Sequence, residues 1–220
     1  VNPNKIHIVY PFADPAFAKV KRTARFQTDS TRVLFAGRLV PEKGIYLLME
    51  AIHHNVLQDG NFSLTVTNAG NQTSPGDVIE HILHAHPSIR VIKARTSPAE
   101  MARLYARYDI VVVPSNHTYW HEAFGMVSVE AQHSGCKVVA SKADGLLETN
   151  CGELVYFEAG NSYDMARKIA SAAKAGPLLP EQRADTVLHF TREASVNSLL
   201  AVIDRYTSGD GQATLPRTTL

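Results

Sequence analysis

The sequence predicts an α/β protein with a Rossmann-like, doubly wound sheet of six parallel strands and helices on both faces. Short apolar runs alternate with segments of helical length that carry apolar residues on one face. Most of these runs are rich in Val, Ile and Leu, as buried parallel strands are, so both faces of the sheet should be covered. One domain is enough, because 220 residues with 45% hydrophobic content can form one large core.

The expected strands are apolar runs bounded by turn residues. They are Arg32–Gly37, Ser63–Asn68, Ile89–Lys93, Asp109–Pro114, Lys137–Ala140 and Glu153–Tyr156. Helices between them are expected at Ile45–Leu57, Asp77–His86, Pro98–Arg107 and Phe124–Ser134. Two more helices should follow, at Ser162–Lys174 and from Pro180 towards Tyr206. Ser97 illustrates a helix start, because it is a good N-cap and precedes a proline whose missing N–H costs nothing there.

The domain is expected to have a leading and a trailing segment. We predict that residues 1–30 form a connector between domains and that residues 31–206 form the folded domain with its C-terminal helices. Residues 207–220 should form a polar tail that frays. Pro3, Pro11 and Pro15 should keep the connector extended. The sequence begins with Val1, and no charged-then-apolar signal segment follows, so we expect a piece of a longer protein.

Composition excludes several classes of partner. Lys and Arg number 22 against 21 Asp and Glu, and a net charge of +1 offers no broad cationic field for nucleic acid or an anionic bilayer. No apolar stretch reaches the roughly 18 residues of a spanning helix. Cys136 and Cys151 fit neither a zinc spacing nor a disulfide framework, which suits a reducing compartment. We therefore expect a soluble, cytoplasmic chain whose anion sites are local.

The segment GRLVPEKG, residues 37–44, ends a predicted strand and opens a helix. Gly37 allows a ligand to approach the backbone closely, and Arg38 and Lys43 can converge on one anion near a helix N-terminus. A diphosphate fits such a loop. A tight turn with two solvated cations fits the spacing equally well. The GxxxxGK[ST] order of a P-loop is absent, so ATP hydrolysis has no support.

The segment HEAFGMVSVEA, residues 121–131, places two carboxylates eight residues apart. At about 100° per residue, two helical positions with this spacing lie about 80° apart. Glu122 and Glu130 can therefore face one cleft if Glu122 lies at the start of the helix. Periodicity alone favours the other reading, in which Glu122 complements the helix dipole and Glu130 is a surface residue.

Together with KVVAS at 137–141 and Gly145, these segments resemble the C-terminal domain of retaining GT-B glycosyltransferases of group 1 (family 4), from about Ile6 to Lys174. The resemblance implies that residues 31–206 bind a nucleotide sugar. It also implies transfer of a hexosyl unit from an NDP-sugar, expected to be a UDP-sugar, to an acceptor hydroxyl in glycan, glycolipid or polysaccharide synthesis. The N-terminal acceptor domain lies outside this chain, which should bind the donor without completing the transfer. Contact with a membrane would be indirect, through that domain.

The resemblance also implies roles for individual residues. Arg38 and Lys43 would neutralise the donor diphosphate, and Glu122 would lie next to the transferred sugar, so these three are the expected catalytic residues. Glu130 would accept hydrogen bonds from the ribose hydroxyls. The other implied donor-binding residues are Gly37, Arg95, Thr96, Phe124, Gly125, Met126 and Val127. The family needs no cofactor, because the NDP-sugar is a substrate and no metal is expected.

Departures from the family pattern leave alternatives open. Ala94 and Asn68 stand where glycine is common, and the segment 142–149 lacks the usual GG-x-x-E order, which puts sugar selectivity in question. A nucleotide-sugar-binding module without catalysis, a GT-B epimerase or phosphorylase, and a purely structural domain remain alternatives. The paired histidines at 53–54 and the group at 81–86 lie on expected helix surfaces without a carboxylate constellation, so we predict no metal site.

Overall fold

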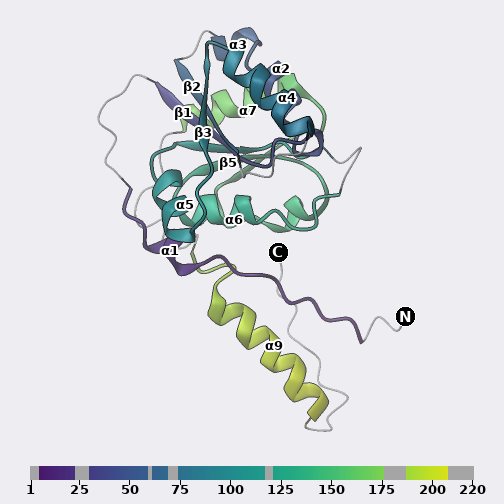
Figure 1. Ribbon diagram of the computed structural model, residues 1–220. Coiled ribbons are helices and arrows are strands. Elements are labelled where there is room, and N and C mark those ends of the chain that lie inside the picture. The colour runs from purple at the N-terminus through teal and green to yellow at the C-terminus, as the bar shows by residue number, and fades with distance from the viewer. Residues whose placement is uncertain are drawn as a thin grey trace.

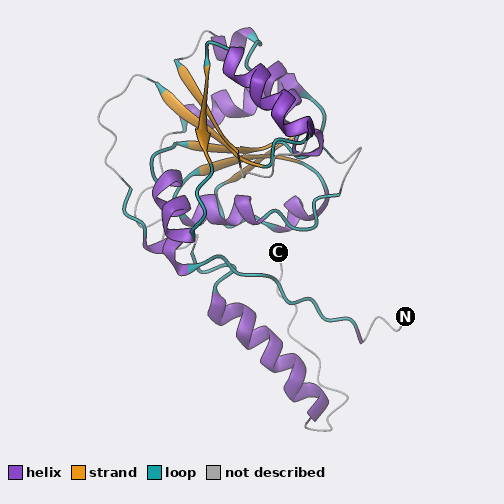
Figure 2. Ribbon diagram, in the orientation of Figure 1, coloured by secondary structure: helices purple, strands orange, loops and turns teal. Residues whose placement is uncertain are grey.

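The computed structural model describes residues 5–22, 30–58, 61–68, 74–116, 121–175 and 187–207. Six strands form one all-parallel sheet in the order β3-β2-β1-β4-β5-β6, with helices on both faces (Figures 1 and 2). The strands are β1 Thr31–Gly37, β2 Phe62–Asn68, β3 Ile89–Lys93, β4 Ile110–Val113, β5 Lys137–Ser141 and β6 Leu154–Phe157. The predicted fold class is confirmed.

Most of the expected helices that fall on described residues are present, and they differ from the prediction mainly at their ends. They are α1 Pro15–Lys19, α2 Ile45–Ala51, α3 Asn55–Gln58, α4 Ser74–Ala85, α5 Pro98–Tyr105, α6 Met126–His133, α7 Ser162–Lys174 and α9 Arg192–Thr207, with short 3-10 helices η2 Pro41–Lys43 and η3 Asp144–Glu148. The continuous helix expected over Ile45–Leu57 is wrong. His53 and His54 bond back to carbonyls three residues earlier, which tightens the last turn of α2 and ends it.

The two flanks also differ from expectation. The connector is not extended throughout, because Pro15 starts α1 behind the cap of Asp14, whose Oδ1 accepts from the N–H of Ala16 at 2.8 Å. Phe17 of this helix is buried in the core. The last helix begins at Arg192, where the N–H of Ala194 donates to Thr191 Oγ1 at 3.1 Å. The predicted start at Pro180 and the tail beyond residue 207 lie outside the described residues.

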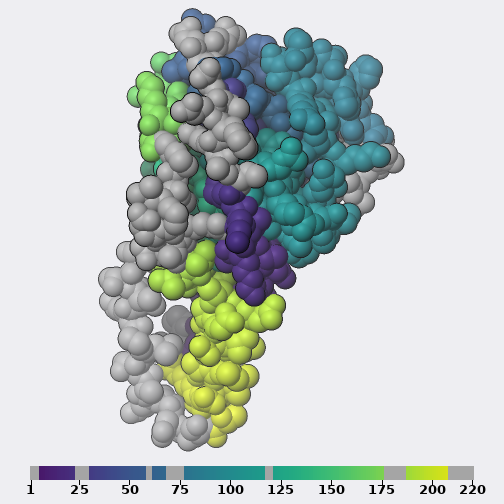
Figure 3. Space-filling view, turned by 90° about the vertical axis from the view of Figure 1, so that its left-hand side faces the viewer, coloured from purple at the N-terminus to yellow at the C-terminus, as the bar shows by residue number. Residues whose placement is uncertain are grey.

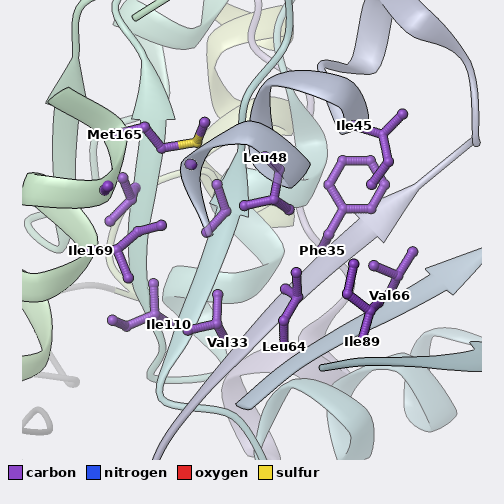
Figure 4. Close-up of a cluster of buried hydrophobic side chains, with 14 of the residues drawn as sticks. Val33, Phe35, Ile45, Leu48, Leu64, Val66, Ile89, Ile110, Met165 and Ile169 are labelled. Atoms are coloured by element: carbon purple, nitrogen blue, oxygen red, sulfur yellow. The ribbon is translucent and has the colours of Figure 1, made fainter. Parts of the chain in front are cut away.

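Alternation along the strands sends side chains to two cores, one on each face of the sheet. Val33 and Phe35 of β1 pack with α2, α4 and α7, as Figure 4 shows for part of this cluster. Leu34 points the other way, towards α1, α5 and α6. Both faces are therefore buried, as the apolar runs predict.

Strand order positions the candidate site. From β1 the chain moves outward to β2 and β3, then returns to place β4 on the other side of β1. Ligands of such sheets bind beyond the carboxyl ends of the strands where the order reverses. The loop after β1 and the loop after β4 lie on either side of this point.

A buried polar cluster fastens the segment after β5 to α6. The side chain of Gln132 is fully buried, its Nε2 donates to the carbonyl of Thr149 at 2.8 Å, and its Oε1 accepts from the N–H of Cys151 at 2.8 Å. Thr149 Oγ1 donates in turn to Ser128 Oγ at 2.9 Å. This cluster holds the segment that follows η3 against α6.

Replacing Gln132 by leucine should lower the free energy of unfolding by about 2–4 kcal/mol, because two buried backbone groups lose their partners. Urea denaturation measures the loss. Ser134→Ala is the matched control, since Ser134 Oγ is buried with no hydrogen-bond partner among the described residues. A loss in the control equal to that in Gln132→Leu contradicts the explanation.

Apolar side chains remain exposed at one end of the molecule. In α9 they are Val196, Leu199, Leu200, Ile203 and Tyr206, whose i, i+3, i+4, i+7 pattern from Val196 places them on one side of the helix. The segment before α1 adds Ile6, Ile8, Val9 and Phe12. The two segments are joined, because Ser195 Oγ donates to the Tyr10 carbonyl and His7 Nε2 lies 3.0 Å from Tyr206 Oη. Figure 3 shows α9 extending from the body at this end. We call these nine side chains the apolar end.

Candidate functional site

A pocket of about 390 Å³ opens at the carboxyl ends of β1 and β4. Its described walls include the ends of both strands, Lys43, Ser115 and residues 122–127. The structure therefore brings together most of the predicted site residues, namely Gly37, Lys43, Glu122, Phe124, Gly125, Met126 and Val127. The pocket lies at the reversal of strand order, where ligands of this architecture bind.

Lys43 and Glu122 form the charged centre of the pocket. Lys43 Nζ lies 2.5 Å from Glu122 Oε2, and Ser115 Oγ donates to the same oxygen at 2.9 Å. The two charged side chains are only 23% and 16% exposed, so water screens them less than a surface pair. An ammonium group has three donors, and one suffices for Glu122. Lys43 can therefore hold a ligand anion while it remains next to Glu122.

Close packing of two loops produces this pair. Gly44 adopts φ 72°, and a Cβ there would lie 1.7 Å from the carbonyl oxygen of Pro114. The N–H of Asn116 donates to the Glu42 carbonyl at 2.8 Å, which joins the same loops a second time. At Gly37, in contrast, a Cβ would meet only the Phe35 ring at 3.7 Å, an ordinary contact. The fold thus requires glycine at 44, whereas at 37 its small size leaves room in the pocket.

The amino end of α6 forms another wall of the pocket. Gly125, at φ 91°, is the N-cap and supplies no side-chain cap, and the next two residues line the pocket. Their N–H groups have no partner within the helix, and the helix dipole adds partial positive charge there. The expected helix start at Phe124 is wrong by two residues, because Gly125 turns the chain with a positive φ. The wall favours an anionic ligand.

Four predicted residues lie outside the described walls of this pocket, namely Arg38, Arg95, Thr96 and Glu130. Arg38 follows Gly37, but its side chain is 52% exposed and only reaches Glu42, at 4.0 Å. Such a long, exposed pair constrains a side chain weakly. Arg95 and Thr96 follow β3 at the same edge of the sheet and are exposed. Their donor-binding role remains a prediction.

Glu130 lies on α6 away from Glu122. Its Oε2 accepts a long hydrogen bond, 3.4 Å, from the hydroxyl of buried Tyr105. Burial raises the pKa of the Glu130 carboxyl to about 7; the hydrogen bond from Tyr105 opposes the rise and the charge of Asp14 adds to it. Since α6 begins at Met126, Glu122 precedes the helix and the 80° spacing of helical positions does not apply. The structure brings Glu122, and not Glu130, to the described walls of the pocket.

The raised pKa of Glu130 makes stability depend on pH. Between about pH 4.5 and 7 the folded state keeps a proton that the unfolded state has lost, so stability falls as pH rises through this window. The full effect is about 3 kcal/mol at most. Glu130→Gln should therefore gain stability relative to the unmodified chain between pH 5 and pH 8, as urea unfolding at both values measures. If the difference in the free energy of unfolding between the two proteins is the same at pH 5 and pH 8, this explanation is wrong.

Two features of the site were missed from the sequence. Ser115 lies two residues after the end of β4, and a polar residue just beyond the carboxyl end of a central parallel strand is the signal for it. The second feature is a contact between loops: the N–H of Gly145 donates to the Glu122 carbonyl at 2.9 Å, and His121 Nδ1 lies 2.8 Å from Asp144 Oδ1. Glu122 is thus positioned from both its side chain and its backbone.

The described residues hold neither a cluster of metal-binding side chains nor a helix that could span a membrane. They contain no group of three or more His, Cys, Asp or Glu side chains placed to hold a metal ion. Among the helices that the structure describes, none has both the length and the apolarity to cross a membrane. Independence from metal remains a prediction.

Comparison with known proteins gives a consistent family. Residues 17–186 match the family described as glycosyl transferases group 1. The chain is 32% identical over 160 residues to D-inositol 3-phosphate glycosyltransferase of Corynebacterium glutamicum (strain R), covering 66% of this chain and 37% of that protein. It is 36% identical over 126 residues to lipopolysaccharide 1,2-N-acetylglucosaminetransferase of Salmonella typhimurium, covering 54% of this chain and 32% of that protein. The matched region thus spans about a third of the length of these relatives.

Solved structures show the same fold. A glycosyltransferase from Rickettsia africae matches 96% of this chain with a TM-score of 0.78 at 16% identity, over 59% of its own length. Anabaena HepE in complex with UDP-glucose matches 91% of this chain with a TM-score of 0.60 at 20% identity, over 54% of its own length.

Proposed function

This chain belongs to the family of group 1 glycosyltransferases, and we propose that it is the donor-binding half of a retaining enzyme that transfers a hexosyl unit from an NDP-sugar to an acceptor hydroxyl. The observation that carries the proposal is the partly buried Lys43–Glu122 pair at the amino end of α6. An ammonium group and free helix N–H groups suit a diphosphate, while a carboxylate beside them suits sugar hydroxyls.

The same groups explain how the chain would assist the reaction. When the bond between the sugar and the diphosphate breaks, negative charge grows on the leaving diphosphate. Lys43 and the N–H groups of Met126 and Val127 stabilise that charge without reorganising, because the fold already holds them in place. Glu122, fixed by Lys43 and Ser115, orients the sugar that is transferred. Arg38, which is exposed in the free chain, moves onto the diphosphate when the donor binds.

We take UDP-glucose and related UDP-sugars as the first donors to test, because the similar HepE structure contains UDP-glucose. The acceptor half is proposed to be another domain of the same protein. The apolar end supports this arrangement, since nine large apolar side chains in joined segments form the kind of surface that a second domain covers.

Calorimetric titration with UDP, GDP, ADP and their sugar conjugates tests donor binding. One nucleoside diphosphate should bind, and Arg38→Ala/Lys43→Ala should abolish the binding. Lys142→Ala is the matched control, because Lys142 pairs with Glu158 on the exposed surface at 3.6 Å. Absence of binding both by the chain and by the full-length protein contradicts the proposal.

Transfer is tested on the full-length protein by NMR of the product, whose anomeric configuration should equal that of the donor. A nucleotide-sugar-binding module is the alternative. It predicts donor binding with no transfer, and Glu122→Gln would then change nothing but affinity.

A further inference from the structure

The opposite edge of the sheet, at the amino ends of β1, β2 and β3, has two adjoining hollows. The first, of about 300 Å³, we call the arginine hollow; its walls include Arg32, Arg90 and Arg107. The second, of about 510 Å³, we call the apolar hollow; its walls include Leu48, Leu57 and Ile169. Leu64, Pro87 and Ser88 line both hollows, so the two meet at the turn before β3.

The arginine hollow has the chemistry of an oxyanion site. No carboxylate occurs among its described walls, while Ser63 and Ser88 add hydroxyl groups. Arg32 is held by Asp109, with Nη2 to Oδ1 at 3.1 Å. Arg90 and Arg107 are exposed, and neither forms an ion pair with a carboxylate of the described chain. Guanidinium groups bind phosphate through paired N–H donors, so these two arginines are suited to a phosphoryl group.

The apolar hollow has the chemistry of a hydrocarbon site. Leu48, Leu64 and Ile169 form its floor and belong to the core cluster of Figure 4. The polar side chains among its described walls are Ser88 and the imidazoles of His53 and His86, whose ring centroids lie 5.3 Å apart. A hollow of this size that is lined mainly by apolar side chains, with a few polar ones among them, is typical of small-molecule sites.

We propose that this edge binds an amphipathic phosphate, with its phosphoryl head on Arg90 and Arg107 and its hydrocarbon chain in the apolar hollow. The inference goes beyond the proposed function and does not depend on it. Val33 of the apolar hollow and Gly37 of the donor pocket are four residues apart on β1, about 13 Å along the strand. The two ligands therefore occupy opposite ends of the same strand.

The probe is decyl phosphate, and decanol and inorganic phosphate serve as controls that each represent one half of it. Calorimetry measures the binding affinity of each compound, below the concentration at which decyl phosphate forms micelles. Decyl phosphate should bind at least tenfold more tightly than either half. Across hexyl, octyl and decyl phosphate the affinity should rise about fourfold per methylene, the gain expected for burial of each group. Equal affinity along the series, or no binding at all, overturns the proposal.

Variants locate the site. Arg90→Ala/Arg107→Ala should weaken decyl phosphate binding at least tenfold, while Arg103→Ala should not, because Arg103 is an exposed arginine of α5 outside the described walls of both hollows. Lys43→Ala should leave decyl phosphate binding unchanged. If Lys43→Ala abolishes it instead, the probe binds in the donor pocket and the proposal is wrong.

The phosphate can come from a free amphiphile or from a lipid in a membrane. Cosedimentation with phosphatidylglycerol vesicles, and with phosphatidylcholine vesicles as the control, separates these sources. Binding to phosphatidylglycerol that the double arginine variant abolishes identifies a membrane lipid. Binding of soluble decyl phosphate without vesicle binding identifies a free amphiphile. Failure of both overturns this inference and leaves the donor titration unaffected.

Discussion

Replacing Lys43 by alanine is expected to lower the kcat/KM of the full-length enzyme by roughly 10²- to 10³-fold, the usual loss when one fixed group that stabilises a developing anion is removed. Lys43 is partly buried and held by Glu122, so it needs no reorganisation when charge develops. Its loss also leaves the Glu122 carboxylate without its cation. Initial rates with a UDP-sugar as donor measure the effect.

A folding measurement and a control variant separate the function of Lys43 from its role in folding. Lys43→Ala should melt cooperatively, since the core clusters on both faces of the sheet do not contain Lys43. Lys142→Ala, the surface control, should keep its activity. The assignment of Lys43 to the diphosphate is wrong if a folded Lys43→Ala enzyme keeps kcat/KM within threefold of the unmodified enzyme.

Replacing Gly44 by alanine should lower the free energy of unfolding by about 2–5 kcal/mol, the sum of a left-handed backbone and an overpacked contact. Its Cβ would lie 1.7 Å from the Pro114 carbonyl oxygen, and a backbone atom cannot rotate away as a side chain can. Either the loop after β1 or the end of β4 must move. Because Lys43 is the preceding residue, donor binding should weaken as well.

Gly160→Ala is the control for the backbone contribution. Gly160 has φ 78°, close to that of Gly44, but its Cβ would meet no atom within 4 Å. This variant should lose only about 1–2 kcal/mol, the cost of a left-handed non-glycine residue. Urea unfolding of both variants gives the difference, which is the cost of the contact. Equal losses in the two variants would mean that the loops can separate freely.

Much of the fold could be predicted because it depends on local patterns. Each of the six strands is an apolar run bounded by turn residues, and the cap of α5 is a local hydrogen bond in which Ser97 Oγ accepts from the N–H of Glu100. The residues at which helices begin and end could not be predicted as well, because they depend on backbone conformations that the apolar patterns do not encode. Gly125, for example, begins α6 with a positive φ although Phe124 suits a helical position.

The site was predictable in part, through the family resemblance. Lys43, Glu122 and the residues up to Val127 meet in one pocket, as that resemblance implies. Spacing alone did not reveal that Lys43 contacts Glu122, since 79 residues separate them and only the sheet order brings them together. The contact of Glu130 with Tyr105 likewise depends on how α5 and α6 pack.

The reversal of strand order divides the molecule along a seam. Residues 31–93 form one half of the sheet and carry Lys43, whereas residues 98–157 form the other half and carry Ser115 and Glu122. Neither half alone contains the ammonium group together with its carboxylate. A chain cut between Lys93 and Ser97 would therefore separate the two charges, and recovery of nucleotide binding would report that the fragments have complemented each other.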